Sequence, residues 1–312
     1  MDHAIRGALG ELGSVVSVTR RLLPPLLWDA LRRLRASVRG VRQRPEWEYV
    51  PEGWARAQID PNVKGWNVAA VSERHRLLWP LWTRALEGTG TLGVDFWRPL
   101  RMRDYDGRSI PTDLPWAHNA AMAFAYVLAL TARNKERLSI LDLGGGVGQF
   151  SPLTRALLPD VEIDYHVVDT PVMCSLGREL NPVLHFYEDE SWQGRKYDFV
   201  LASGALQCTE QWQRTLEALA KATAEHLLIT RIPIVFGHPS FVVLQRAEDY
   251  GFETEFLGWF VNREELLDCA TGAGVELLRE FVMLDETPAH GAPEQATYRG
   301  FLFRPARATA SK

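Results

Sequence analysis

Glycines dominate the segment that follows the apolar run 138–143. Positions 144, 145, 146 and 148 are all glycine in the stretch Leu141-Asp142-Leu143-Gly144-Gly145-Gly146-Val147-Gly148. Glycine reaches positive φ without strain and carries no side chain, so a bulky nucleoside can lie against bare backbone there. In open α/β sheets, ligands bind where a strand gives way to the helix that follows it. The segment therefore predicts a nucleoside-binding turn, with a tight structural turn as the alternative.

Carboxylates lie at or near the ends of three apolar runs. Asp142 precedes Gly144 by two residues, where an acid is electrostatically suited to a cationic ligand. Asp169 ends the next apolar run, 21 positions after Gly148, and its oxygens can accept hydrogen bonds from both ribose hydroxyls. Asp189 follows a third run and is either a further ligand contact or an exposed loop acid.

Two classes of nucleotide cofactor compete for this turn. A dinucleotide site has the spacing G-x-G-x-x-G, but Gln149 stands where the third glycine would be. The spacing found here, G-x-G-x-G with Asp142 before it, resembles the first motif of class I methyltransferases, which bind S-adenosylmethionine. A nicotinamide oxidoreductase is therefore disfavoured.

Strand and helix patterns alternate from residue 120 onward. Alternation of this kind predicts a parallel sheet with helices on both faces. Two late strands with no helix between them predict a C-terminal antiparallel hairpin. The expected fold is Rossmann-like α/β with a mostly parallel seven-stranded sheet. The expected strands are 138–143, 163–168, 183–187, 197–202, 226–232, 275–284 and 297–303, and the expected helices are 120–130, 149–158, 171–180, 210–224 and 263–271.

Motifs spread over residues 45–285 are similar to a bacterial group of methyltransferases that is defined largely by sequence. The residues that carry the resemblance are Trp47-Glu48-Tyr49, Gly53-Trp54, Leu141 to Gly146, Val168-Asp169-Thr170-Pro171, Leu184 to Tyr187, Ser203 to Gln207, Thr230 to Pro233 and Gln245. The resemblance implies a class I fold, S-adenosylmethionine as cofactor, and an association with surface polysaccharide biosynthesis. Cys208 departs from the pattern, which has an aromatic residue there.

The resemblance and the motifs together give a set of cofactor-binding candidates. Asp189 is placed as in methyltransferases that hold the adenine amino group, and the methyl donor would lie over small residues after the fourth strand. The candidates are Asp142, Gly144, Gly145, Gly146, Gly148, Gln149, Asp169, Thr170, Asp189, Ser203 and Gly204.

Methyl transfer requires the acceptor atom to be aligned with the donor, and a hydroxyl acceptor also benefits from a general base. His118 and His238 both lie where they could reach the ends of the predicted strands, and either could instead be a loop or packing histidine. Arg231 could hold an anionic acceptor group or brace a neighbouring carboxylate. These three residues are the catalytic candidates.

Composition divides the chain into three parts. Residues 1–44 form a basic extension, with eight arginines and one aspartate between positions 20 and 44. An amphipathic helix there could lie on an anionic membrane or dock its leucines on the main domain. Residues 45–119 are rich in tryptophan and proline and predict an irregular cap that contributes to the substrate site. Residues 120–312 form the methyltransferase domain.

Charge and cysteine content exclude several classes of function. The net charge of −4 argues against general nucleic-acid binding. Three cysteines far apart predict neither a disulfide framework nor a zinc site, and no closely spaced histidine pair marks a metal. We expect a cytoplasmic protein, with contact at the inner membrane surface through residues 20–44 as a further expectation.

The sequence favours an O-methyltransferase that acts on a sugar of a cell-surface glycan or its precursor. One alternative is an O- or N-methyltransferase of a specialised small metabolite. The other is a non-catalytic scaffold that retains the methyltransferase fold.

Overall fold

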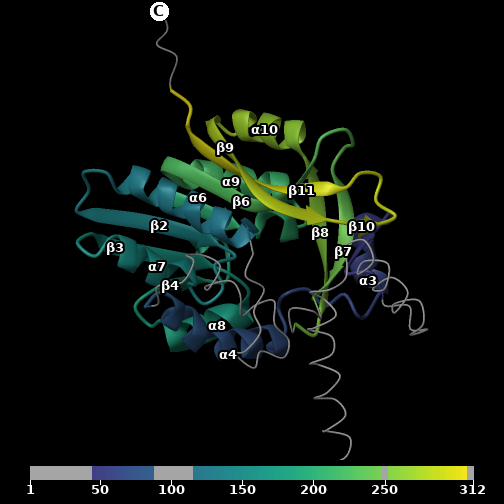
Figure 1. Ribbon diagram of the computed structural model, residues 1–312, viewed down its shortest axis with the longest axis horizontal. Helices are drawn as coiled ribbons and strands as arrows, with labels where there is room; N and C mark the ends of the chain where they lie inside the picture. The colour runs from purple at the N-terminus through teal and green to yellow at the C-terminus, as the bar shows by residue number, and fades with distance from the viewer. Residues whose placement is uncertain (1–43, 88–114, 248–251, 308–312) are drawn as a thin grey trace, which may run out of the picture. The chain divides into compact units, whose positions relative to one another are not determined.

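The computed structural model describes residues 44–87, 115–247 and 252–307 (Figure 1). The chain divides into two compact units, residues 1–44 and 45–312, and the second is described here. The predicted basic helix of residues 1–44 and its membrane contact lie outside the described residues and stay predictions, as does the part of the predicted cap between 88 and 114.

Seven strands form the central part of one sheet, in the order β4-β3-β2-β5-β6-β11-β9. The first five run parallel, and β11 is antiparallel to both β6 and β9. This arrangement confirms the predicted fold class and its C-terminal antiparallel hairpin. The strands are β2 (Arg137–Leu143), β3 (Glu162–Val168), β4 (His185–Tyr187), β5 (Tyr197–Ser203), β6 (Thr223–Val235), β9 (Val275–Thr287) and β11 (Ala296–Pro305).

Helices cover both faces of this sheet because the strands are apolar on both sides. In β2, Ile140 packs on the face with Phe124 and Phe150, whereas the next residue, Leu141, packs on the opposite face with Trp212. The first face is covered by α6 (Pro115–Ala132), α7 (Phe150–Leu157) and α8 (Pro171–Leu180), and the second by α9 (Trp212–Ala222) and α10 (Arg263–Gly272). Two short 3-10 helices, η3 (Glu190–Trp192) and η4 (Leu206–Cys208), follow β4 and β5.

Four further strands extend the sheet beyond the seven that the sequence predicted, so the described sheet has 11 strands. The end of β6 pairs with β8, which pairs with β7, and Figure 1 shows β7 and β8 side by side. Next come β1 and β10. These strands are β1 (Trp47–Tyr49), β7 (Phe241–Arg246), β8 (Glu255–Asn262) and β10 (Ala289–His290).

The predicted cap is more regular than expected. It contains η1 (Gly53–Ala55), α3 (Arg56–Ile59) and the 17-residue helix α4 (Ala69–Ala85), which continues through Pro80. Leu78 and Trp82 of α4 are buried in the core, and the helix lies beside α8 (Figure 1). Tertiary burial therefore overrides the local effect of the proline. Among the helices that the structure describes, none combines the length and apolar composition needed to cross a bilayer.

Candidate active site

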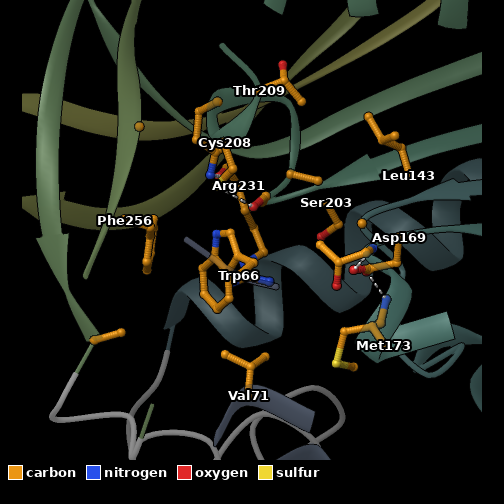
Figure 2. Close-up of a pocket in the computed structure, with 18 of the residues that line it drawn as sticks. Trp66, Val71, Leu143, Asp169, Met173, Ser203, Cys208, Thr209, Arg231 and Phe256 are labelled. Atoms are coloured by element: carbon orange, nitrogen blue, oxygen red, sulfur yellow. Dashed lines mark hydrogen bonds between the residues drawn. The ribbon is translucent and has the colours of Figure 1, made fainter. Parts of the chain in front are cut away.

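A cavity of about 650 Å³ opens at the carboxyl ends of β2, β3 and β5. One end is lined by the glycine turn and the residues that follow these strands. The other end is lined by aromatic side chains, among them Trp66 and Phe256. Figure 2 shows the indole of Trp66 in the middle, with Phe256 on one side and Asp169 and Ser203 on the other. The cavity thus joins two chemically different surfaces.

The glycine turn brings bare backbone to the cavity wall. Gly144 and Gly146 both line the cavity and adopt positive φ angles of 67° and 61°. A Cβ at Gly144 would lie 2.4 Å from the Cβ of Ala205, which is too short for two carbons that are not bonded to each other. Glycine is therefore required at this position for both its conformation and the close approach of the next strand end.

Asp169 stands at the centre of the polar end. Its Oδ2 accepts a hydrogen bond from the backbone N–H of Gly146 at 2.8 Å, and its Oδ1 accepts one from that of Thr170 at 2.6 Å. Burial raises the pKa of Asp169, and these two hydrogen bonds oppose the shift. Each oxygen keeps a lone pair for a further donor. The side chain is therefore fixed in place and ready to accept two ligand hydroxyls.

Among the buried polar atoms on the cavity wall that lack hydrogen-bond partners within the described residues, two belong to the end of β5 and the 3-10 helix that follows it. They are Oγ of Ser203, at the end of β5, and Oε1 of Gln207, in η4. A buried polar atom without a partner costs about 1–3 kcal/mol. A ligand that supplies donors at this end of the cavity would satisfy both atoms, so the wall fits a polar cofactor.

Aromatic rings form the other end. The ring of Trp66 lies 4.1 Å from that of Phe256 and 5.6 Å from that of Phe252. Trp116 and Trp47 also line the cavity. Flat, apolar walls of this kind suit a ring-shaped ligand, because aromatic faces bury large areas and prefer stacked or edge contacts.

His75 is a cavity residue that the sequence reasoning missed. Its Nδ1 lies 2.9 Å from the carbonyl oxygen of Val71, which can only accept, so Nδ1 carries the proton and Nε2 keeps a lone pair in the neutral ring. Burial lowers the pKa of His75 to about 4, and the ring stacks on Phe252. The signal was present: Val71, His75, Leu78 and Trp82 follow helical spacing, and all four are buried.

Residues 116–280 match a family model described as a methyltransferase domain, which covers more than half of the chain. The chain belongs to this methyltransferase family. It is an S-adenosylmethionine-dependent methyltransferase, so the predicted enzyme class and cofactor are confirmed. A link to polysaccharide biosynthesis is not part of this finding.

Solved structures resemble the methyltransferase at low sequence identity. The 1,6-didemethyltoxoflavin-N1-methyltransferase of Burkholderia thailandensis is 17% identical and covers 61% of this chain and 80% of its own, with a TM-score of 0.40. Magnesium protoporphyrin IX methyltransferase of Synechocystis PCC 6803 is 14% identical, with coverages of 68% and 97% and a TM-score of 0.43. The CcbJ methyltransferase of Streptomyces caelestis is also 14% identical, with coverages of 70% and 98% and a TM-score of 0.42. No curated protein sequence matches the chain.

Most of the predicted cofactor residues come together in the methyltransferase cavity. Those that line it are Gly144, Gly146, Gln149, Asp169, Thr170, Ser203 and Gly204. Gly145 and Gly148 complete the turn without lining the cavity, and a Cβ at Gly148 would lie 2.4 Å from Leu184. The cofactor-binding roles of all these residues stay predictions.

Asp142 and Asp189 lie outside the cavity. Asp142 is buried beneath Gly145, where it accepts a hydrogen bond of 2.7 Å from the Tyr165 hydroxyl, and burial raises its pKa to about 7. Its side chain points to the face opposite that of Leu143, as strand alternation requires. Asp189 lines an adjoining hollow, where its hydrogen bonds with Ser191 lower its pKa. Asp142 therefore lies beneath the turn and does not line the cavity, and its role toward the cofactor stays a prediction.

Neither histidine predicted as a general base lines the cavity. His118 lies on α6, and His238 lies between β6 and β7 with its Nδ1 2.8 Å from the carbonyl oxygen of Pro239. Position near a strand end does not fix the direction of a loop or of a preceding helix, and the catalytic roles of both histidines stay predictions. Arg231, in contrast, does line the cavity, with its guanidinium 5.0 Å from the Trp116 ring and a φ of 56°.

Proposed function

We propose that this methyltransferase holds S-adenosylmethionine at the glycine end of the cavity and methylates an oxygen or nitrogen of a small ring-bearing acceptor at the aromatic end. The observation that carries the proposal is the continuity of the cavity, which lets ligands at the two ends touch. Family membership and the intact glycine turn favour this enzyme over the non-catalytic scaffold.

The chain's own residues would bind and orient the two reactants. The cofactor supplies a methyl group on a cationic sulfur, which is already activated for in-line displacement. Asp169 would accept hydrogen bonds from two ribose hydroxyls, and Ser203 would gain a partner for its buried hydroxyl. The apolar walls around Trp66 would exclude water and align the acceptor atom, which is the main requirement of this reaction.

His75 would accept a hydrogen bond from a hydroxyl group of the acceptor and so orient it. Its Nδ1–H is held by the Val71 carbonyl, so the lone pair on Nε2 is the free position of the ring. Its depressed pKa keeps the ring neutral at physiological pH, and hence able to accept a hydrogen bond. The guanidinium of Arg231 lies close to Gly204 and would bind an anionic group of the acceptor.

A sugar of a surface glycan or its precursor is a second candidate acceptor. The specific observation in its favour is that Trp47, Trp66 and Trp116 all line the cavity. Tryptophan faces can stack on the apolar face of a sugar ring, with polar groups fixing its orientation.

Calorimetric titration with S-adenosylmethionine, S-adenosylhomocysteine and NAD tests the cofactor half. We expect binding of the two adenosyl ligands alone. Asp169→Asn should weaken that binding by about 1.5–3 kcal/mol, which is the range for a hydrogen bond to a charged group. Asp160→Asn, which changes an exposed acid outside the cavity, is the matched control. Equal affinities in all three proteins would remove Asp169 from the site.

Radiolabel transfer from S-adenosylmethionine to parallel panels of small aromatic compounds and of sugars tests the acceptor half. Trp66→Ala should reduce transfer to the preferred acceptor while leaving S-adenosylhomocysteine affinity unchanged. If Trp66→Ala lost both methyl transfer and S-adenosylhomocysteine binding, the division of the cavity into two ends would be contradicted.

A further inference from the structure

Three potential metal ligands gather on one face of the sheet, outside the cavity. Asp164 and His166 lie two residues apart on β3 and therefore point to the same face. His166 is the register partner of His185 on the parallel strand β4, and the two imidazole rings stack with centroids 4.6 Å apart. Strand geometry alone thus brings the three side chains together.

The distances between the ligand atoms suit a shared ion. Asp164 Oδ1 lies 2.9 Å from His166 Nε2 and 3.4 Å from His185 Nε2, and all three atoms lie within 4.8 Å of one another. Zinc binds nitrogen and oxygen ligands at about 2.0–2.2 Å, so two adjacent ligands of one octahedral or tetrahedral ion lie about 2.8 to 3.6 Å apart. The two measured distances fall in that range.

The buried histidine has a nitrogen without a hydrogen-bond partner. His166 is fully buried, and its Nε2 forms no hydrogen bond with any described residue even though Asp164 Oδ1 is only 2.9 Å away. The contact is short enough for a hydrogen bond but is not aligned for one. Misalignment is expected when the nitrogen lone pair points at an ion between the two atoms and not at the oxygen.

The surroundings leave these ligand atoms available. His166 Nδ1 lies 3.1 Å from the Tyr187 hydroxyl, an outer contact of the kind that orients metal-bound histidines. The cations that face Asp164 are Arg137 and Arg195, and both approach its other oxygen, Oδ2, at 3.3 and 3.9 Å.

We propose that Asp164 Oδ1, His166 Nε2 and His185 Nε2 bind a zinc ion that ties the edge strand β4 to β3. Two imidazoles and one carboxylate are a ligand set that zinc accepts, and the exposed His185 leaves room for a water ligand. The sequence predicted no metal because it contains no closely spaced histidine pair. His166 and His185 are 19 positions apart and meet only through the register of the sheet.

Zinc titration of tag-free, chelator-treated protein tests the site, by calorimetry and by thermal melting. We expect one zinc ion per chain and a higher melting temperature with zinc. His185→Ala changes an exposed side chain and should weaken zinc binding by at least about tenfold. His290→Ala removes another exposed histidine, on β10, and should change nothing.

Asp164→Asn is a second variant, and its melting curve without zinc checks that it folds. It should also lose zinc affinity, whereas Asp160→Asn should retain it. No zinc binding by the wild type, or equal binding by all the variants, would overturn the proposal. S-adenosylhomocysteine affinity, measured in the same proteins, should stay constant, which separates this site from the proposed function.

Discussion

The two ends of the cavity are built in different ways. The glycine end consists of backbone and of residues that directly follow β2, β3 and β5, so short local motifs specify it. The aromatic end draws its side chains from segments far apart in the chain, including β1, α4, α6 and β8. Local motifs therefore specify the glycine end, whereas the aromatic end depends on tertiary contacts that no motif encodes.

Substitution at Gly144 should have the largest effect on the glycine end. Gly144→Ala places a Cβ at positive φ and 2.4 Å from Ala205. Left-handed strain and overpacking each cost about 1–3 kcal/mol, so we expect a loss of roughly 2–6 kcal/mol in unfolding free energy. Cofactor binding should be lost as well. Urea denaturation and S-adenosylhomocysteine titration measure the two effects.

Gly274→Ala is the matched control for this prediction. Gly274 also has a positive φ, of 85°, but its added Cβ would meet nothing within 4 Å. It should therefore show the backbone strain alone, about 1–3 kcal/mol, with cofactor affinity intact. Equal losses in the two variants would mean that close packing against Ala205 contributes nothing.

Much of the central fold could be predicted, because its strands are apolar and alternate with helices. Strand β8 and helix α4 could not. Strand β8 pairs with only the last two residues of β6, and its register with β7 is set by tertiary contacts. Helix α4 contains Pro80, a local signal against a helix that burial of Trp82 outweighs.

The candidate site likewise contains residues that the sequence could predict and residues that it could not. Asp169 and Ser203 were predicted because strand ends meet at one edge of a parallel sheet. His75 was missed because its helix was not expected, whereas His238 lies outside the cavity, in a loop where Glu294 accepts its backbone N–H. Local sequence therefore predicts much of the glycine end of the cavity but gives little information about the aromatic end.

Asp142 offers a test through pH. Its folded pKa of about 7 exceeds its ordinary value of 3.8, so the folded protein holds a proton that the unfolded chain releases between these values. Stability contributed by this group therefore falls as pH rises from about 4 to 7, by on the order of 4 kcal/mol. Asp142→Asn should remove this slope, as measured by denaturation at a series of pH values. An unchanged slope would mean that Asp142 is not buried beneath the turn.

The smallest effect should come from the surface contact that joins α4 to α8. Arg76 Nη2 donates to Glu179 Oε2 at 2.7 Å, but both side chains are about half exposed. Exposed ion pairs contribute about 0.2–1 kcal/mol, so Arg76→Ala should lower the unfolding free energy by no more than that. Leu78→Ala, on the buried face of the same helix, should cost about 2–5 kcal/mol and should also impair acceptor methylation. If Arg76→Ala proved as damaging as Leu78→Ala, the aromatic end would depend on a surface contact instead of on the burial of α4.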